Sequence, residues 1–210
     1  MINLLVYFTF YILIFFSIVG YGTALAKKNE NNIGIIGFAG IFLLIIISYI
    51  TNYIFHHGYY HNSIILLIGI IFFVFNSKNI FKHKILNSKI YAIILTILFM
   101  GLLISKNHDD FFYYHFGYTL SLINFTKIIG IGHLEHGFRT PSSIFYLNSL
   151  FYLPYIKYFM LHSGAIFFMI FSNFFFIEKI SYLRKIKSKN YYLLFLATFS
   201  LIFINTVFYR

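Results

Sequence analysis

The sequence predicts an all-α, polytopic helical membrane protein with about six transmembrane helices, and three observations support this fold class. Apolar residues make up 60% of the 210 residues, and charged residues make up only 10%. The mean hydropathy is +0.81, far above the value of a soluble domain. The apolar residues also lie in six separate runs, with most Lys and Arg residues between them. A water-soluble single domain is therefore excluded.

The composition also limits the chemistry and the partners that we expect. The chain contains no Cys, which excludes disulfides and Cys-based metal or redox sites. The formal net charge of +11 would suggest nucleic acid as a partner if the chain were soluble. Here the cations lie between apolar runs, so we expect membrane lipids, and not nucleic acid, as the partner.

Helices are expected in these runs because the runs are too long and continuous for the strands of a membrane barrel. About 20 helical residues cross a hydrocarbon core of roughly 30 Å. The six predicted crossings are Ile2 to Gly22, Ile33 to Phe55, Ile64 to Phe75, Ile90 to Ser105, Tyr158 to Ile177 and Tyr191 to Tyr209. The third run has only twelve uninterrupted apolar residues, so it must borrow His61, Asn62 and Asn76 at its ends.

The first run is interpreted as an uncleaved anchor, although Ala24-Leu25-Ala26 resembles a signal-peptide cleavage site. The run lacks the cationic start of a signal peptide and is longer than a usual signal core. Lys27 and Lys28 follow it directly. An anchor in this place would retain both lysines in the cytoplasm.

Connections rich in Lys and Arg alternate with connections that are poor in them. Lys27 and Lys28 follow the first run, no cation lies between the second and third runs, and four lysines separate the third from the fourth. Three cations are spread over residues 105 to 155, whereas five lie within residues 179 to 189. By the positive-inside rule, both termini and the long 105–155 loop lie outside the cytoplasm.

A single integral membrane domain is expected over residues 1–210. The sequence has no internal repeat and no Pro-rich or Gly/Ser-rich linker. Because the chain ends at Arg210 directly after an apolar run, two alternatives stay open, a complete protein and the N-terminal part of a longer one.

Most of the acidic residues lie in the long outward loop. Asp109 and Asp110 directly follow the fourth run, and Glu135 lies further along. Adjacent residues diverge by roughly 100° around a helix, so the two aspartates suit different roles. One could accept a proton from an acceptor hydroxyl while the other binds a divalent cation such as Mg or Mn. The alternative is an ordinary solvated pair at the end of a span.

Other side chains of the loop could bind a substrate or a metal. His133 and His136 are three residues apart and could share a helical face, which makes His133 a candidate metal ligand beside Asp110. A guanidinium suits two-pronged binding of phosphate. The candidate substrate-binding residues are Arg139, His115, His136 and Tyr113. For the loop histidines the alternative is a place among polar residues at the membrane interface. The preceding His56, His57 and His61 could face the same cavity, but with Tyr59 and Tyr60 beside them we interpret them first as an interfacial belt.

The end of the loop is expected to form a short helix along the membrane surface, from Ile144 to Pro154. Ser142 and Ser143 precede it and are candidate capping residues. The loop as a whole is rich in Phe and Tyr, which predicts a segment that packs on the membrane surface and is not disordered.

The run Asp109-Asp110-Phe-Phe-Tyr-Tyr-His115, a Gly-rich middle, and Ser142-Ser-Ile-Phe-Tyr-Leu-Asn-Ser149 carry a family resemblance. They are similar to the outward loop of bacterial multi-pass proteins that in turn resemble the GT-C glycosyltransferases. The resemblance covers roughly residues 105 to 155. It implies that Asp109 and Asp110 are the catalytic acidic pair and that the donor is a polyprenyl-phosphate-linked sugar. It also implies a location in a bacterial inner membrane, with sugar transfer at its outer face.

Two other classes of function remain open. A transporter or flippase component usually carries ionisable residues within its spans and helices broken by Gly or Pro. Here Glu178 is expected at the edge of the fifth span, and Pro141 and Pro154 both lie in the loop, which disfavours transport. A non-catalytic assembly subunit is the third class, and it would tolerate replacement of both aspartates.

Overall fold

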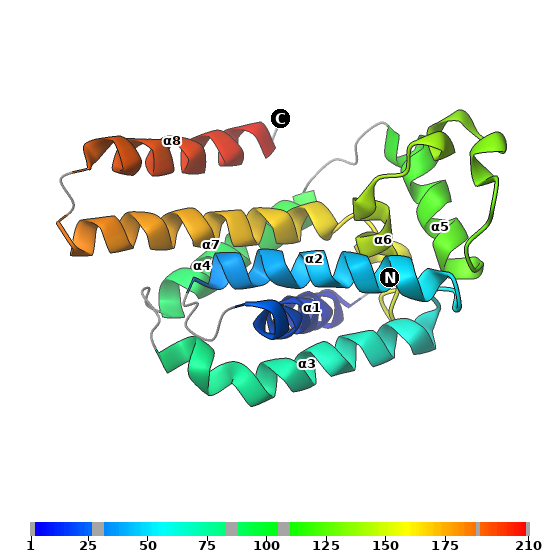
Figure 1. Cartoon of the computed structure of the whole chain (residues 1–210), viewed down its shortest axis with the longest axis horizontal. Coiled ribbons are helices and arrows are strands. Elements are labelled where there is room, and N and C mark those ends of the chain that lie inside the picture. Colours follow the sequence, from blue (N-terminus) through cyan, green and yellow to red (C-terminus); the bar gives the residue numbers. More distant parts are fainter. Residues whose placement is uncertain (1–2, 27–31, 83–87, 105–109, 188–189, 209–210) are drawn as a thin grey trace.

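The computed structural model describes residues 3–26, 32–82, 88–104, 110–187 and 190–208, which form a bundle of helices capped at one end (Figure 1). The described residues contain no strand, only an isolated β-bridge between Leu153 and Lys157. The predicted all-α fold class is therefore confirmed.

Each of the six apolar runs contains one long helix. These helices are α1 (Leu4–Leu25), α2 (Ile33–Asn52), α3 (Tyr59–Lys82), α4 (Ser88–Ile104), α7 (Gly164–Lys185) and α8 (Tyr191–Phe208). By length and composition, α1, α2, α3 and α7 can each cross a membrane, whereas α4 and α8 are apolar but shorter. A membrane protein with four candidate crossings is thus supported, and the number six stays a prediction.

The third run extends at both ends as expected, since α3 continues from Tyr59 to Lys82 and includes His61, Asn62 and Asn76. The bounds of the fifth run are corrected by the structure. The fifth helix was placed wrongly at both ends, since α7 begins at Gly164 and not at Tyr158, and continues to Lys185. Residues 158–163 do not join it, because Tyr158–Met160 form a short 3-10 helix and turns follow up to Ser163.

The connection between α4 and α7 folds into a separate layer of short helices. They are η1 (Phe111–His115, a π-helical turn), α5 (Phe116–Asn124), η2 (Ile131–His133), η3 (His136–Arg139), α6 (Ser143–Ser149) and η4 (Tyr158–Met160). We call residues 53–58 and 110–163 together the loop layer. Ser142 caps α6 as expected, accepting a hydrogen bond from Ile144 N. The helix is shorter than the expected 144–154 segment, and its Tyr146, Leu147 and Ser149 are fully buried where it packs on α2, α5 and α7. Its position along a membrane surface stays a prediction.

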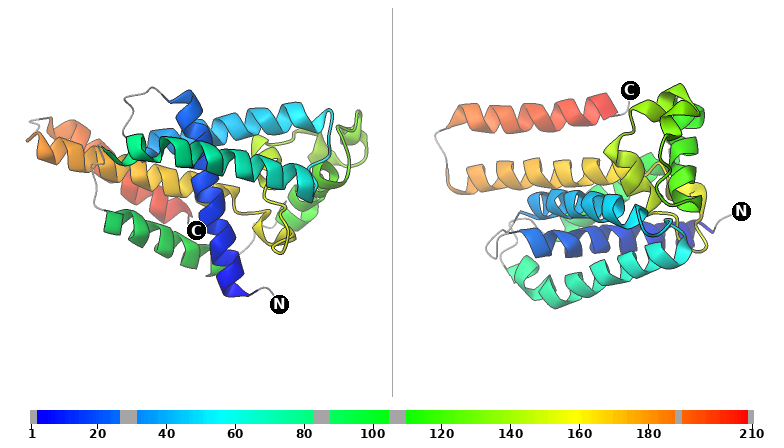
Figure 2. Two further views of the ribbon diagram at one scale, coloured as in Figure 1. Left: turned by 90° about the horizontal axis from the view of Figure 1, so that it is seen from below. Right: turned by 45° about the vertical axis from the view of Figure 1, so that its right-hand side comes forward.

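Helix α1 lies at the centre of the bundle and crosses its neighbours obliquely (Figure 2). Its side chains Tyr11, Ile14 and Ile18 are fully buried, and it packs mainly on α2 and α3. Helix α2 in turn packs on α7, and α7 carries α8 on its outer side. The resulting apolar core contains residues of every long helix except α8, which only adds partly buried Ile204.

Glycines let these helices approach until their backbones touch. A Cβ atom added at Gly20 of α1 would overlap the carbonyl oxygen of Gly69 of α3. A Cβ at Gly40 of α2 would likewise overlap the carbonyl oxygen of Ile18. Small residues at helix contacts are typical of membrane bundles, because lipid supplies no hydrophobic drive between helices and close packing must hold them together.

The helices alternate in direction, so the loop layer and the described chain ends lie at one end of the bundle (Figure 2). Helices α1, α3 and α7 run away from the loop layer, and α2, α4 and α8 run toward it. The far end of α7 carries exposed Lys179, Arg184 and Lys185. The side of the membrane that each end faces stays a prediction from the charge count.

Candidate functional site

Of the two aspartates that the sequence singles out, the structure describes only Asp110. Asp109 lies outside the described residues. Asp110 is partly exposed and directly precedes η1, with helical backbone angles. It lies in the loop layer, beyond the end of α4. Asp110 thus lies in the layer beyond the apolar bundle, and its predicted place at the outward membrane surface stays a prediction.

The structure brings the predicted site segments of the loop together. The η1 turn, with Tyr113 and His115, packs against η3, which contains His136 and Arg139. The contact is so close that a Cβ atom added at Gly137 would overlap the ring of Tyr114. These segments are more than 20 residues apart in the chain, so only the fold makes them neighbours.

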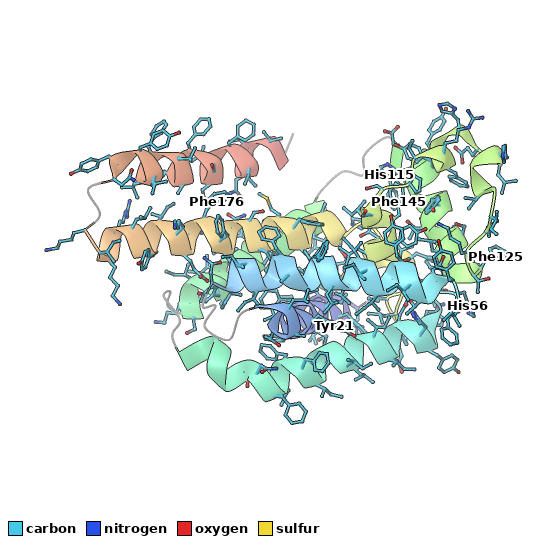
Figure 3. All side chains as sticks on the ribbon, viewed as in Figure 1. Tyr21, His56, His115, Phe125, Phe145 and Phe176 are labelled. Carbon is cyan, nitrogen blue, oxygen red and sulfur yellow. The ribbon has the colours of Figure 1, made fainter. Side chains whose placement is uncertain are left out.

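The candidate substrate-binding side chains differ in accessibility. Tyr113 is 79% exposed, and His136 and Arg139 are also exposed. Arg139 donates from Nε to the carbonyl oxygen of Gly132 at 3.3 Å, which leaves the other guanidinium nitrogens able to bind a ligand. His115 is only half-buried but is in ring contact with Phe145, at 4.7 Å between ring centroids (Figure 3).

A metal site is not assembled by the residues that the structure describes. A cation in a protein takes at least three protein or water ligands in a fixed geometry. In the described part of the chain, no group of three His, Asp or Glu side chains converges in this way. His133 is exposed on η2. The proposed pair of Asp110 and His133, with Asp109 outside the description, therefore stays a prediction.

A buried polar cluster beneath the loop layer was not predicted. Asn62 of α3 is 1% exposed, and its Nδ2 donates to the carbonyl oxygens of His57 at 2.8 Å, Ser149 at 2.9 Å and Tyr152 at 2.9 Å. The amide has two hydrogens, so one of them is shared between two carbonyls. One side chain thus joins the start of α3 to the 53–58 connection and to the end of α6.

His57 is the second member of this cluster and is completely buried. Its Nδ1 lies 2.7 Å from Ser149 Oγ, which itself donates to the carbonyl oxygen of Tyr146 at 2.8 Å. The imidazole is therefore the donor in the His57–Ser149 bond. Burial, assisted by the neighbouring His61, lowers the pKa of His57 to about 3. The ring is neutral and structural, and its complete burial excludes contact with a substrate.

Further hydrogen bonds tie α5 to the end of α2. The backbone N–H of His57 donates to the carbonyl oxygen of Leu122 at 2.9 Å, and the N–H of Lys127 donates to that of Asn52 at 2.8 Å. Asn52 is fully buried and donates from Nδ2 to Leu122 and Phe125. The loop layer is therefore fastened to the bundle by backbone and amide groups.

Three tyrosines and a lysine pack on the inner side of α5. The ring of Tyr146 stacks on Tyr49 at 3.7 Å, and its hydroxyl accepts a hydrogen bond from Lys127 Nζ at 2.6 Å. The Tyr118 hydroxyl lies 3.2 Å away. Burial raises the pKa of Tyr118 and of Tyr146, so both hydroxyls stay protonated near neutral pH.

A cleft of about 560 Å³ opens beside the buried polar cluster of Asn62 and His57. Its walls come from the 53–58 connection, the first turns of α3, the end of α5 and Tyr152. The lining includes His56, His61, Tyr59 and Tyr60, for which the sequence favoured a surface belt over a place facing a cavity. The one sequence signal for the cleft is the dense run of His and Tyr between the second and third apolar segments.

One acidic side chain lies inside the bundle, which corrects the expectation that Glu178 is at the edge of a span. Helix α7 extends past it to Lys185, and Glu178 is fully buried. Its Oε1 accepts hydrogen bonds from the Tyr91 hydroxyl at 2.7 Å and from the N–H of Ile33 at 3.3 Å. Ile33 is the first residue of α2, and a helix N-terminus stabilises a nearby carboxylate.

Comparison with known proteins adds no relative, since no protein-family model matches the chain and neither a curated protein nor a solved structure is detectably similar to it. The class supported by the fold is that of a helical membrane protein with a structured loop layer at one end.

Proposed function

We propose that this protein is a membrane-embedded glycosyltransferase that takes a sugar from a polyprenyl-phosphate-linked donor at the outer face of a bacterial inner membrane. One observation carries this proposal. The segment that follows Asp110 packs against the segment of His136 and Arg139, at the end of an apolar helix bundle. This arrangement supports the proposal, because an acid and side chains that suit phosphate would lie together near the level of a lipid-linked phosphate.

The proposed reaction assigns a role to each side chain. The acceptor hydroxyl oxygen attacks the anomeric carbon of the donor sugar, the bond to the phosphate oxygen breaks, and polyprenyl phosphate leaves. Asp110, or its neighbour Asp109, accepts the hydroxyl proton. Arg139 and His136 stabilise the negative charge of the departing phosphate, with His115 and Tyr113 beside them. A bound Mg or Mn ion, held by Asp110 and His133, would supply further positive charge there.

An assay of sugar release from donor lipids, with the purified protein in lipid nanodiscs, tests the proposal. The donors are polyprenyl phosphates that carry different radiolabelled hexoses, and the readout is label leaving the lipid. We expect turnover with the unmodified chain and a loss of at least about 100-fold in the double variant D109N/D110N, because either aspartate could be the general base and its removal costs about this much. E30Q is the matched control, because Glu30 lies between the first two apolar runs and not in the loop.

Two outcomes would contradict this function. One is equal turnover in D109N/D110N and in the unmodified chain. The other is no turnover with any donor from folded protein, which would favour the non-catalytic assembly subunit.

Transport is a second candidate function, and a specific observation favours it. Glu178 is fully buried in the part of α7 that can cross a membrane. Buried acids at such positions often take part in proton or substrate translocation. Uptake of labelled substrate by sealed proteoliposomes, without product formation, would support this function if E178Q abolished it. Uptake that E178Q leaves unchanged would remove the observation on which this candidate rests.

A further inference from the structure

The cleft beside α3 has the size and the lining of a small-molecule site. Its volume of about 560 Å³ lies within the usual range for ligand pockets. Aromatic side chains form most of its walls, including Phe55, Tyr59, Tyr60 and Tyr152. No Lys, Arg, Asp or Glu is among its described lining residues, so its hydrogen-bonding groups are the imidazoles, the tyrosine hydroxyls and the amide of Asn124.

The cleft continues directly into the outer apolar face of α3. Ile64 lines the cleft and is 58% exposed. One and two turns further along α3, Leu67, Ile68 and Ile71 are also exposed. These residues follow the three- and four-residue spacing of one helical face. In a membrane this face meets lipid chains, so a ligand in the cleft can keep an attached chain beside α3.

The cleft is also held in shape before any ligand arrives. Asn62 fixes the backbone of His57 and Tyr152 on either side of it. Tyr59 and Tyr152 stack at 4.3 Å between ring centroids, with their planes 11° apart. The N–H of His57 holds the end of α5 through Leu122. A site that is already ordered loses little entropy on binding.

We propose that this cleft binds the sugar headgroup of a glycolipid whose hydrocarbon chain lies along α3. The apolar faces of a sugar ring pack on tyrosine rings, and its hydroxyls exchange hydrogen bonds with His56, Asn124 and Tyr60. A neutral lining suits hydroxyl groups better than a phosphate, which would require a cation that the described lining does not supply. This inference deepens the proposed function and rests on it only where the bound glycolipid serves as a substrate for transfer.

Photocrosslinking of the full-length chain in nanodiscs tests this site. The probe is a long-chain alkyl glucoside that carries a diazirine on the chain next to the sugar. We expect the label on peptides covering residues 53–64 and 120–152. Octyl glucoside should compete for labelling at least about 100-fold better than methyl glucoside, since each buried methylene adds apolar burial that the free sugar lacks. A probe with the same alkyl chain and diazirine but a phosphocholine head should label the cleft at least about 10-fold less.

Two variants and a matched control test the contacts themselves. Tyr60 is 89% exposed and Asn124 is also exposed, so Y60A and N124A remove cleft side chains without emptying the core. Each should lower labelling about 10-fold, the effect of losing one good contact. Y192A is the control, because Tyr192 is also an exposed tyrosine, at 71%, and lies in the first turn of α8, which begins at the end of the bundle away from the loop layer (Figure 1).

The outcomes separate this inference from the proposed function. Four results would overturn the glycolipid site. The label could lie on other peptides, or the phosphocholine probe could label the cleft equally well. Methyl glucoside could compete as well as octyl glucoside, or Y60A and N124A could leave the labelling unchanged. Labelling of the cleft together with equal turnover in D109N/D110N would leave the site in place and reject the transfer reaction. Turnover lost in D109N/D110N, together with labelling that fails in any of the ways just given, would reject the site and leave the reaction in place.

Discussion

The helix bundle and the loop layer are held together by different forces. In the bundle, α1, α2 and α3 meet through glycines, with backbone against backbone. The loop layer is fastened by hydrogen bonds. Asn62 and Asn52 donate to its backbone carbonyls, and the imidazole of His57 donates to Ser149 Oγ. The physical reason is that long helices satisfy their own backbone groups, whereas the irregular segments 53–58 and 150–163 leave carbonyls that need side-chain donors. Close backbone packing at glycines therefore stabilises the bundle, and side-chain hydrogen bonds stabilise the loop layer.

Replacement of a contact glycine should produce the largest effect. A methyl group at Gly40 overlaps the carbonyl oxygen of Ile18, which cannot move without shifting α1. We expect G40A to lower the free energy of unfolding by about 3 kcal/mol or more. The loss can be measured by unfolding in mixed detergent micelles.

The matched control for this prediction is G117A in the loop layer. The nearest atom to a Cβ at Gly117 is on the Phe138 ring, at 3.3 Å, and a ring can give way. Gly117 lies in helix α5, where alanine is intrinsically favoured by about 1 kcal/mol. A loss in G117A as large as that in G40A would show that the two regions do not differ as described.

Removal of the Asn62 amide should produce the next largest effect. N62A leaves the carbonyls of His57, Ser149 and Tyr152 without this donor in a buried place. We expect a loss of about 3 kcal/mol in the free energy of unfolding, because unsatisfied buried groups cost about 1–3 kcal/mol each. Hydrogen exchange should also become faster in residues 53–58 and 150–154, while that of α1 changes little.

N76A provides the control for this experiment. Asn76 is also on α3, but it donates only to the carbonyl oxygen of Phe72 within its own helix. Its loss should change the free energy of unfolding by less than about 0.5 kcal/mol. Uniform acceleration of exchange across the bundle in N62A would contradict a role confined to the loop layer.

A change of pH should produce a smaller effect that also acts on the loop layer. The pKa of His57 is about 3 in the fold and 6.5 in its ordinary state, so the unfolded chain binds a proton that the folded chain does not. Stability is therefore complete above about pH 6.5 and falls as the pH drops toward 3. Between pH 7 and pH 5 the loss from this group is about 2 kcal/mol.

Thermal unfolding of the unmodified chain and of H57Q at both pH values checks this prediction. H57Q is less stable at pH 7 but cannot take up the proton. The gap in stability between the two proteins should therefore shrink by about 2 kcal/mol from pH 7 to pH 5. An unchanged gap would mean that His57 does not carry the pH dependence.

The sequence could predict part of the candidate site but not its assembly. The order of Asp110, His115, His136 and Arg139 in one loop is visible in the chain, and the structure packs their segments against each other. The roles of Asn62 and Ser149 could not be predicted, because the two residues are 87 positions apart and each is unremarkable locally. Glu178 was placed at an edge because the apolar pattern ends near it, whereas its partner Tyr91 lies 87 residues away.

The sequence by itself determined the all-α class, the six apolar helices and the position of the polar segment between the fourth and fifth. These properties depend on local composition and on the length of apolar runs, which act through neighbouring residues. Only the tertiary structure decided which glycines touch, which carbonyls Asn62 satisfies and where a cleft opens. Those features depend on how helices far apart in the chain pack in space, and a one-dimensional pattern does not specify that packing.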